Sequence, residues 1–122
     1  LWLKLRDRYE RALFPLIGVV DQRGMFAESR VLQTGIAVEA LGFQLASEAT
    51  PSALNSRGQI SYSDALQLII DDMPVVPIPD VAAWRDRSRL SYMGVKHADN
   101  LGCVKLRRRS LCGFQAAVAV WA

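Results

Sequence analysis

The chain has 122 residues, of which 51% are hydrophobic, and a formal net charge of +3. This length suits one domain with one core, and this apolar share excludes a disordered chain, so we expect a single domain over residues 1–122. One histidine and two cysteines exclude a disulfide scaffold and a histidine-rich metal site, so no metal or cofactor is expected.

Apolar residues recur at spacings of three and four along most of the chain, which predicts an all-α bundle of about five helices. The first helix is expected over Trp2–Asp21, with a kink at Pro15. The second, over Phe26–Glu48, is apolar on more than one face, which predicts a central position. Glu39 falls on one of these apolar faces, so we expect it to be mostly buried and paired with a cation or a tyrosine hydroxyl. The stripe of the first helix consists of Trp2, Leu5, Tyr9, Leu13, Leu16 and Val20.

A loop rich in serine, asparagine and glycine follows at residues 49–60. Ser61 then begins a short third helix, and Asp64 stands where a capping box needs an acidic side chain. Pro74 ends this helix, because a proline cannot continue the hydrogen-bond ladder.

Asp80 is a predicted N-cap for a fourth helix, which we expect over Val81 to about Gly94. The segment VKHADN at residues 95–100 is expected to break the chain before a fifth helix over residues 100–122. Together with the second helix, this fifth helix is predicted to form the centre of the bundle. Its apolar stripe consists of Leu101, Val104, Leu111, Phe114, Val118 and Trp121.

The ends of the chain and its cysteines bear on where the protein works. The sequence begins with Leu1 and its last predicted helix reaches Ala122, so we expect it to be part of a longer, multidomain protein. Nothing resembles a signal peptide, and the apolar tail from Leu111 is shorter than the roughly 20 residues that span a bilayer. Cys103 and Cys112 are interpreted as small core residues in a reducing compartment. A cytoplasmic protein without a membrane partner is therefore expected.

The positive charge of the chain is concentrated between residues 85 and 109. This segment holds eight arginines and lysines against two aspartates, whereas residues 1–84 hold seven against ten acidic residues. A cationic surface can bind the phosphates of RNA, although a charge run alone is more often a solvated face. The side chains predicted to bind RNA are Arg85, Arg87, Lys105, Arg107, Arg108 and Arg109.

The single histidine, His97, stands at the predicted break after the fourth helix. A lone histidine is more often structural, but here Lys96 adjoins it and Arg89 lies two helical turns earlier. Imidazole exchanges protons near neutral pH, and cations stabilise the charge that develops on a reacting phosphate. These three side chains favour metal-free cleavage of a phosphodiester, with His97 as general acid or base and Arg89 or Lys96 holding the phosphate.

Two segments resemble a known family. AESRVLQTGIAVEALGF at residues 27–43 resembles the second-helix pattern of the Apea-like HEPN domains, and SYMGVKHADN at residues 91–100 resembles their late YNxxKHxD segment. The resemblance implies a helical bundle that forms homodimers and acts as a metal-independent ribonuclease in anti-phage defence or toxin–antitoxin systems. Of the side chains that fit the family pattern, Glu39, Tyr92 and Asp99 are expected to support the histidine.

A second interpretation stays open within the same family. Seven residues separate Arg89 from His97, which is more than the family motif has, and Leu90 follows the arginine in place of a polar residue. Met93 stands where the family pattern has asparagine. The alternative is therefore a non-catalytic HEPN module that binds RNA, dimerises or relays a signal to other domains of the parent chain.

Overall fold

The computed structural model describes residues 1–97, and all of its regular elements in this range are helical. The predicted all-α bundle is therefore confirmed for this part of the chain, with four α-helices. The fifth predicted helix, over residues 100–122, lies outside the described residues. The elements are α1 (Trp2–Asp21), α2 (Ala27–Ala49), the 3₁₀-helix η1 (Pro51–Ala53), α3 (Tyr62–Asp72) and α4 (Val81–Lys96).

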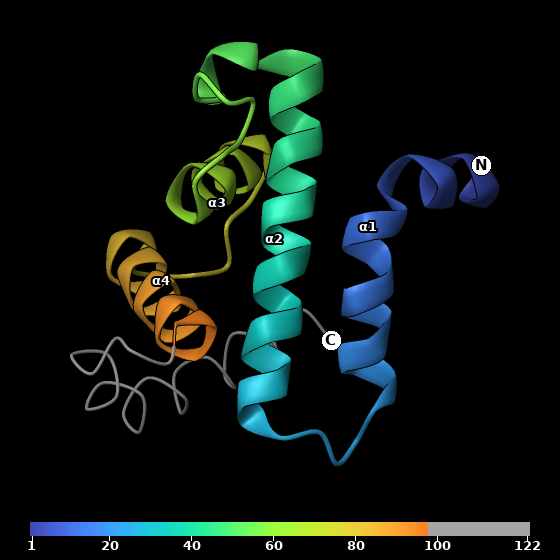
Figure 1. Ribbon diagram of the computed structural model, residues 1–122, viewed down its shortest axis with the longest axis vertical. Helices are drawn as coiled ribbons and strands as arrows, with labels where there is room; N and C mark the ends of the chain where they lie inside the picture. The colour runs from blue at the N-terminus through green and yellow to red at the C-terminus, as the bar shows by residue number, and fades with distance from the viewer. Residues whose placement is uncertain (98–122) are drawn as a thin grey trace.

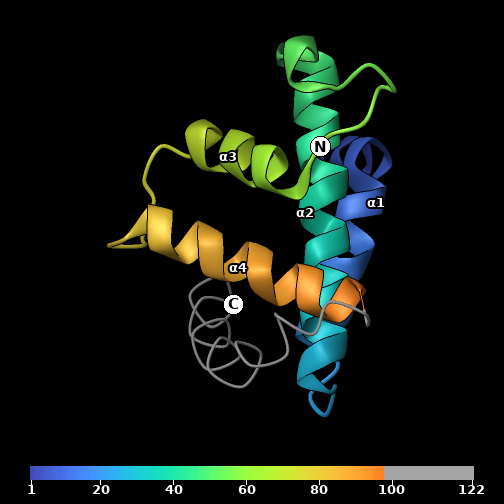
Figure 2. The same cartoon turned by 60° about the vertical axis from the view of Figure 1, so that its left-hand side comes forward.

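Helix α2 is the centre of the described part, as predicted. Figure 1 shows α1 lying antiparallel along one side of α2, with α3 and α4 on the opposite side. In the turned view of Figure 2, α3 and α4 run across α2 rather than along it. A helix that meets neighbours on two sides must be apolar on more than one face, which explains its sequence pattern.

The predicted helix starts of α3 and α4 are confirmed by their capping hydrogen bonds. The Ser61 hydroxyl accepts from the backbone N–H of Asp64 at 3.1 Å and donates to the Asp64 carboxylate at 2.6 Å. The Asp80 carboxylate accepts from the backbone N–H of Ala83 at 3.0 Å. Helix α4 continues to Lys96, two residues beyond the predicted end, so His97 is its C-cap.

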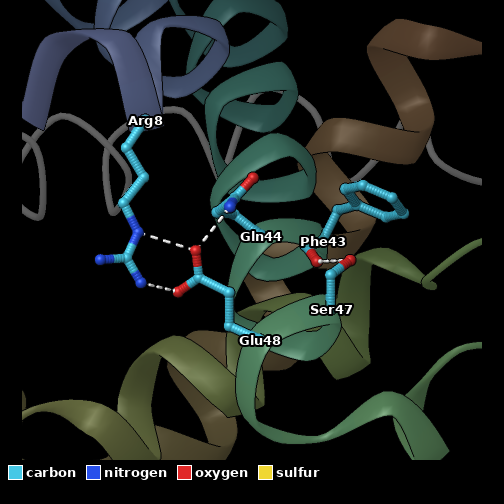
Figure 3. Close-up of polar contacts among 5 residues, drawn as sticks. All are labelled: Arg8, Phe43, Gln44, Ser47 and Glu48. Carbon is cyan, nitrogen blue, oxygen red and sulfur yellow. Dashed lines mark hydrogen bonds and ion pairs between the residues drawn. The ribbon is translucent and has the colours of Figure 1, made fainter. Parts of the chain in front are cut away.

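The kink of α1 lies at Tyr9, and the prediction that it lies at Pro15 was wrong. Tyr9 has non-helical dihedral angles (φ −118°, ψ 18°), whereas Pro15 stays within the helix. The Arg8 guanidinium donates to both carboxylate oxygens of Glu48, in the last turn of α2 (Figure 3). It also lies over the Tyr9 ring, 5.3 Å from the ring centroid. Gln44 donates to the same carboxylate at 2.6 Å. The residues before this kink turn away from α2, and α2 itself continues beyond the level of the kink (Figure 1).

The face of α1 that packs on α2 is also different from the predicted stripe. Its buried residues are Ala12 and Val19, while Trp2 and Val20 of the predicted stripe are 60% and 63% exposed. Small side chains let two helix backbones approach closely, so α1 turns its small residues toward α2. Large apolar side chains of α1 are left on the surface as a result.

On the other side of α2, residues of α3 and α4 lie very close to the α2 backbone. A Cβ atom at Gly35 would lie 2.1 Å from Cδ2 of Tyr92, and one at Gly42 would lie 2.3 Å from Cβ of Ala65. Both distances are far below van der Waals contact, so only glycine fits at these two positions. The glycines, seven residues apart on one face of α2, set the distance at which α3 and α4 pack.

Replacing Gly42 by alanine is expected to lower the free energy of unfolding by about 1–3 kcal/mol. The added methyl group would overlap with the backbone of Ala65, which outweighs the roughly 1 kcal/mol by which alanine is the better helix former. Gly24→Ala is the matched control, since a Cβ atom there meets nothing within 4 Å. Urea unfolding followed by circular dichroism measures both variants, and equal stabilities would contradict the close contact.

Candidate functional site

The side chains of Glu39, Tyr92 and Lys96 meet on the surface between α2 and the last turn of α4. The Tyr92 hydroxyl donates to Oε2 of Glu39 at 3.0 Å. The Lys96 ammonium donates to both oxygens of the same carboxylate, at 3.1 and 3.3 Å. Lys96 Nζ also lies 5.0 Å from the centroid of the Tyr92 ring, within the range of a cation–π contact. One carboxylate thus holds a phenol and an ammonium together.

The position of this cluster follows from the packing of the Tyr92 ring. Tyr92 is 1% exposed, lies against the bare backbone of Gly35 and packs on Tyr62 of α3, with ring centroids 4.7 Å apart. The ring therefore has no freedom to swing, and its hydroxyl points at Glu39. Because Lys96 is one turn further along α4, it reaches the same carboxylate.

Glu39 is paired and mostly buried, as predicted, although water still reaches its side chain. Its side chain is 31% exposed and that of Lys96 is 39% exposed. Breaking a fully buried pair costs about 3–5 kcal/mol, but water at this site solvates any charge left behind, so a smaller cost is expected.

Burial and hydrogen bonding shift three acid–base equilibria at the cluster. Burial raises the pKa of Tyr62 far above its ordinary value, and the charges of Tyr92 and Glu39 add to this effect. Burial also raises the pKa of Tyr92, and its hydrogen bond to Glu39 acts in the same direction. Burial lowers the pKa of Lys96, but hydrogen bonds to Glu39 and Tyr92 outweigh it and leave that pKa raised. All three groups therefore keep their protons at neutral pH.

His97 is exposed at the C-terminal end of α4, immediately after Lys96. Its backbone N–H donates to the carbonyl of Met93 at 3.0 Å, which closes the last turn of the helix. Arg89 is also exposed, but eight residues at 1.5 Å each place it about 12 Å away along the axis of α4. The structure thus brings Lys96 beside His97 and leaves Arg89 two turns away.

The side chains predicted to bind RNA are only partly within the described residues. Arg85 is half-buried and donates to the side chain of Gln67 on α3, which makes it part of the contact between these helices. Arg87 is exposed on α4. Outside the described residues lie Asp99, Lys105, Arg107, Arg108 and Arg109.

A hollow of about 730 Å³ opens next to the cluster, and sequence reasoning missed it. It lies between the kink of α1, the middle of α2 and the loop after η1, and Lys96 closes it on the side of α4. The hollow was missed because part of its wall is formed by α1 residues around the kink at Tyr9, and the sequence did not indicate a kink at that position. The apolar side chains on its wall are Tyr9, Ala12, Ala40, Phe43 and Ile60.

Two further findings bear on the range of functions. Within residues 1–97, no three histidine, cysteine, aspartate or glutamate side chains gather as a metal site would require. None of the helices in the same range combines the length and the apolar character needed to cross a membrane. Comparison of the chain with protein-family models, curated proteins and solved structures gives no match.

The strength of the Glu39–Lys96 pair can be measured by a double-mutant cycle. Glu39→Gln, Lys96→Met and the double variant are expected to give a coupling energy of about 1 kcal/mol, because both groups are about a third exposed. The Arg6–Asp7 pair, with exposures of 47% and 66%, is the matched control and is expected to give almost no coupling. A coupling of several kcal/mol at Glu39–Lys96 would show that the pair is desolvated, contrary to its exposure.

Alkaline pH is expected to destabilise the protein through its buried tyrosines. Because folding raises the pKa of Tyr62 and Tyr92, the folded state holds protons that the unfolded state releases above about pH 10. The tyrosines therefore do not lower the free energy of unfolding below that pH. Above it, the free energy of unfolding falls by up to about 1.4 kcal/mol per pH unit for each tyrosine. In urea titrations between about pH 9 and 12, Tyr62→Phe should show a shallower decline than the wild type. Parallel curves would contradict this origin of the pH dependence.

Proposed function

We propose that the chain is a HEPN-type, metal-independent endoribonuclease domain in which His97 is the general acid or base. The observation that carries this proposal is the exposure of His97 at the end of α4, directly beside Lys96. A structural histidine would be buried with its ring nitrogens satisfied by protein groups. An exposed imidazole next to an ammonium is available to a phosphodiester in solution.

The contact between the two segments that resemble HEPN domains supports the same proposal. Glu39 belongs to the first segment, and Tyr92 and Lys96 belong to the second, more than fifty residues later. Their hydrogen bonds bring the two segments together at the end of α4, next to His97. A shared family pattern is expected to mark residues that meet in the fold, and these residues do so.

The proposed reaction uses the ribose 2′-hydroxyl as nucleophile. His97 takes the proton of this hydroxyl as its oxygen attacks phosphorus, or donates a proton to the 5′-oxygen as the bond from phosphorus to that oxygen breaks. The products are a 2′,3′-cyclic phosphate and a 5′-hydroxyl. Arg89 or Lys96 stabilises the charge on the phosphate, and Glu39, Tyr92 and Asp99 support the site.

The proposal extends to partners and setting. RNA is the substrate, and a homodimer that buries part of residues 85–109 aligns two copies of His97 across one groove. The protein is expected to act in the cytoplasm, in anti-phage defence or a toxin–antitoxin system, with other domains of its parent chain. These points depend on the resemblance and on the concentration of positive charge in residues 85–109.

The second candidate function is a non-catalytic HEPN module for RNA binding, dimerisation or signal relay. It is favoured by the way the described cations are engaged. Lys96 is paired with Glu39, Arg85 is hydrogen-bonded to Gln67, and Arg89 lies about 12 Å along the helix from His97. In residues 1–97, His97 thus lacks an unpaired cation at its side to hold a phosphate.

Cleavage of RNA by the full chain distinguishes the two functions. Removing a general acid or base typically costs 10²–10⁴-fold, so His97→Ala is expected to lower the rate of cleavage by about that factor. EDTA should have no effect, and DNA of the same sequence should resist cleavage because it lacks the attacking hydroxyl. Arg57→Ala, which removes an exposed arginine outside the segment predicted to bind RNA, is the control for a general loss of charge.

Two outcomes would reject the ribonuclease proposal. Cleavage that persists in His97→Ala would show that another group, or a contaminant, is responsible. Cleavage abolished by EDTA would require a metal ion that the proposed mechanism does not use. Binding of RNA without cleavage by the wild-type chain would favour the non-catalytic module.

A further inference from the structure

The hollow between α1, α2 and α4 has a wall without net charge. Its acidic side chains are Asp7, Glu10 and Glu39, and its basic side chains are Arg8, Arg11 and Lys96. Four of these six groups are already engaged, in the ion pairs Arg6–Asp7, Arg8–Glu48 and Glu39–Lys96. A chain of phosphates needs a surplus of free cations, so this wall does not suit the backbone of RNA. It suits a ligand group that carries no charge.

The same wall combines an aromatic surface with amide groups. Phe43 lines the hollow from α2 and is 41% exposed. The side-chain amides that line it are those of Gln44, Asn55 and Gln59. An aromatic ring stacks on other flat π-systems, and an amide both donates and accepts hydrogen bonds. A fatty acyl chain would leave these amides without partners, whereas a flat polar heterocycle uses both the ring and the amides.

The turn that carries Gln59 is held in place by its own hydrogen bonds. The side-chain oxygen of Asn55 accepts from the backbone N–H groups of Arg57 and Gln59, at 2.9 and 3.0 Å. The Asn55 N–H donates to the Gln59 carbonyl at 2.8 Å, and Gly58 takes the left-handed φ of 68° that the turn requires. The backbone of Gln59 is therefore fixed before a ligand arrives, which lowers the entropy lost on binding.

The hollow also adjoins the proposed catalytic group. Lys96 forms its α4 side, and the exposed His97 is the next residue of the chain. The volume of about 730 Å³ lies within the range of about 300–1,000 Å³ that is usual for sites of small organic groups. In a nucleotide, one ribose joins the uncharged base to the charged phosphate. A neutral hollow beside Lys96 and His97 therefore matches the two parts of a nucleotide.

We propose that the hollow receives one unstacked base of the RNA substrate, with its flat face on Phe43 and its edge hydrogen-bonded to Gln59. The proposal rests on RNA as the ligand of the proposed function. The ribose and the phosphodiester then lie at the rim that Lys96 forms, beside His97. Proteins commonly bind single-stranded RNA in this way, by stacking splayed bases on aromatic rings and hydrogen-bonding their edges.

The affinity of the full chain for a non-cleavable RNA tests this assignment. The probe is a fluorescent 2′-O-methyl hexaadenylate, its reference is the same backbone without bases, and fluorescence anisotropy measures both. Loss of one stacked base typically weakens binding about 5- to 140-fold. Phe43→Leu, which keeps an apolar side chain but removes the ring, should therefore weaken binding of the hexaadenylate at least about 5-fold and leave the base-free backbone unaffected. Phe43→Trp restores a ring and should bind like the wild type.

Two further variants complete the test. Phe26→Leu is the matched control, because Phe26 is 79% exposed and lies outside the hollow. Gln59→Ala serves if Phe43→Leu unfolds the chain, since Gln59 is exposed on the fixed turn. Its amide reads the edge of the base, so the differences in affinity among the adenine, cytosine, guanine and uracil hexanucleotides should shrink in this variant.

Several outcomes would overturn the base site. These are equal losses in Phe43→Leu and Phe26→Leu, equal weakening of both probes, and failure of the wild type to bind the hexaadenylate. Adenosine monophosphate that binds as tightly as the hexaadenylate would overturn it too, because the hollow would then be a site for a free nucleotide. The ribonuclease proposal fails separately, through RNA cleavage that persists in His97→Ala. An effect of Phe43→Leu that is confined to the base-bearing probe would still support the base site in that case.

Discussion

The packing of one aromatic ring joins α3 and α4 to α2. Tyr92 presses on the bare backbone of Gly35, stacks on Tyr62 and donates its hydroxyl to Glu39. It therefore connects α2, α3 and α4 through a single side chain that is 1% exposed. A larger residue at position 35 would displace this ring, and with it the end of α4 that carries Lys96 and His97.

Helix α1 is attached to the other side of α2 by a different kind of contact. Ala12 and Val19 are its buried residues, and the Arg8–Glu48 ion pair lies next to the kink. Exposed ion pairs contribute little to stability, so α1 depends mainly on the small residues that it turns toward α2. Several of its large apolar side chains are more than half exposed, among them Trp2, Phe14 and Val20.

The sequence predicted what local chemistry determines and missed what depends on helix–helix distance. The caps at Ser61 and Asp80 and the central position of α2 could be predicted, because each follows from residue type and spacing. The pairing of Glu39 could be predicted from its place on an apolar face. The buried face of α1 could not, because periodicity favours the stripe with the largest side chains, whereas close packing selects the smallest. The kink at Tyr9 lies next to the Arg8–Glu48 ion pair, whose partners are forty residues apart in the sequence, so local spacing does not reveal it.

The Glu39 carboxylate matters for both candidate functions, because it pairs with Lys96, the residue directly before His97. While Lys96 donates to Glu39, a phosphate beside His97 would have to compete with a carboxylate that Tyr92 also holds in place. Catalysis then requires either that the phosphate displaces Glu39 from Lys96 or that cations from residues 105–109 come close to His97. The first route predicts that Glu39→Gln strengthens phosphate binding, while the second predicts little change on that substitution. The affinity of the full chain for a non-cleavable RNA would therefore separate the two routes, whichever of the two candidate functions is correct.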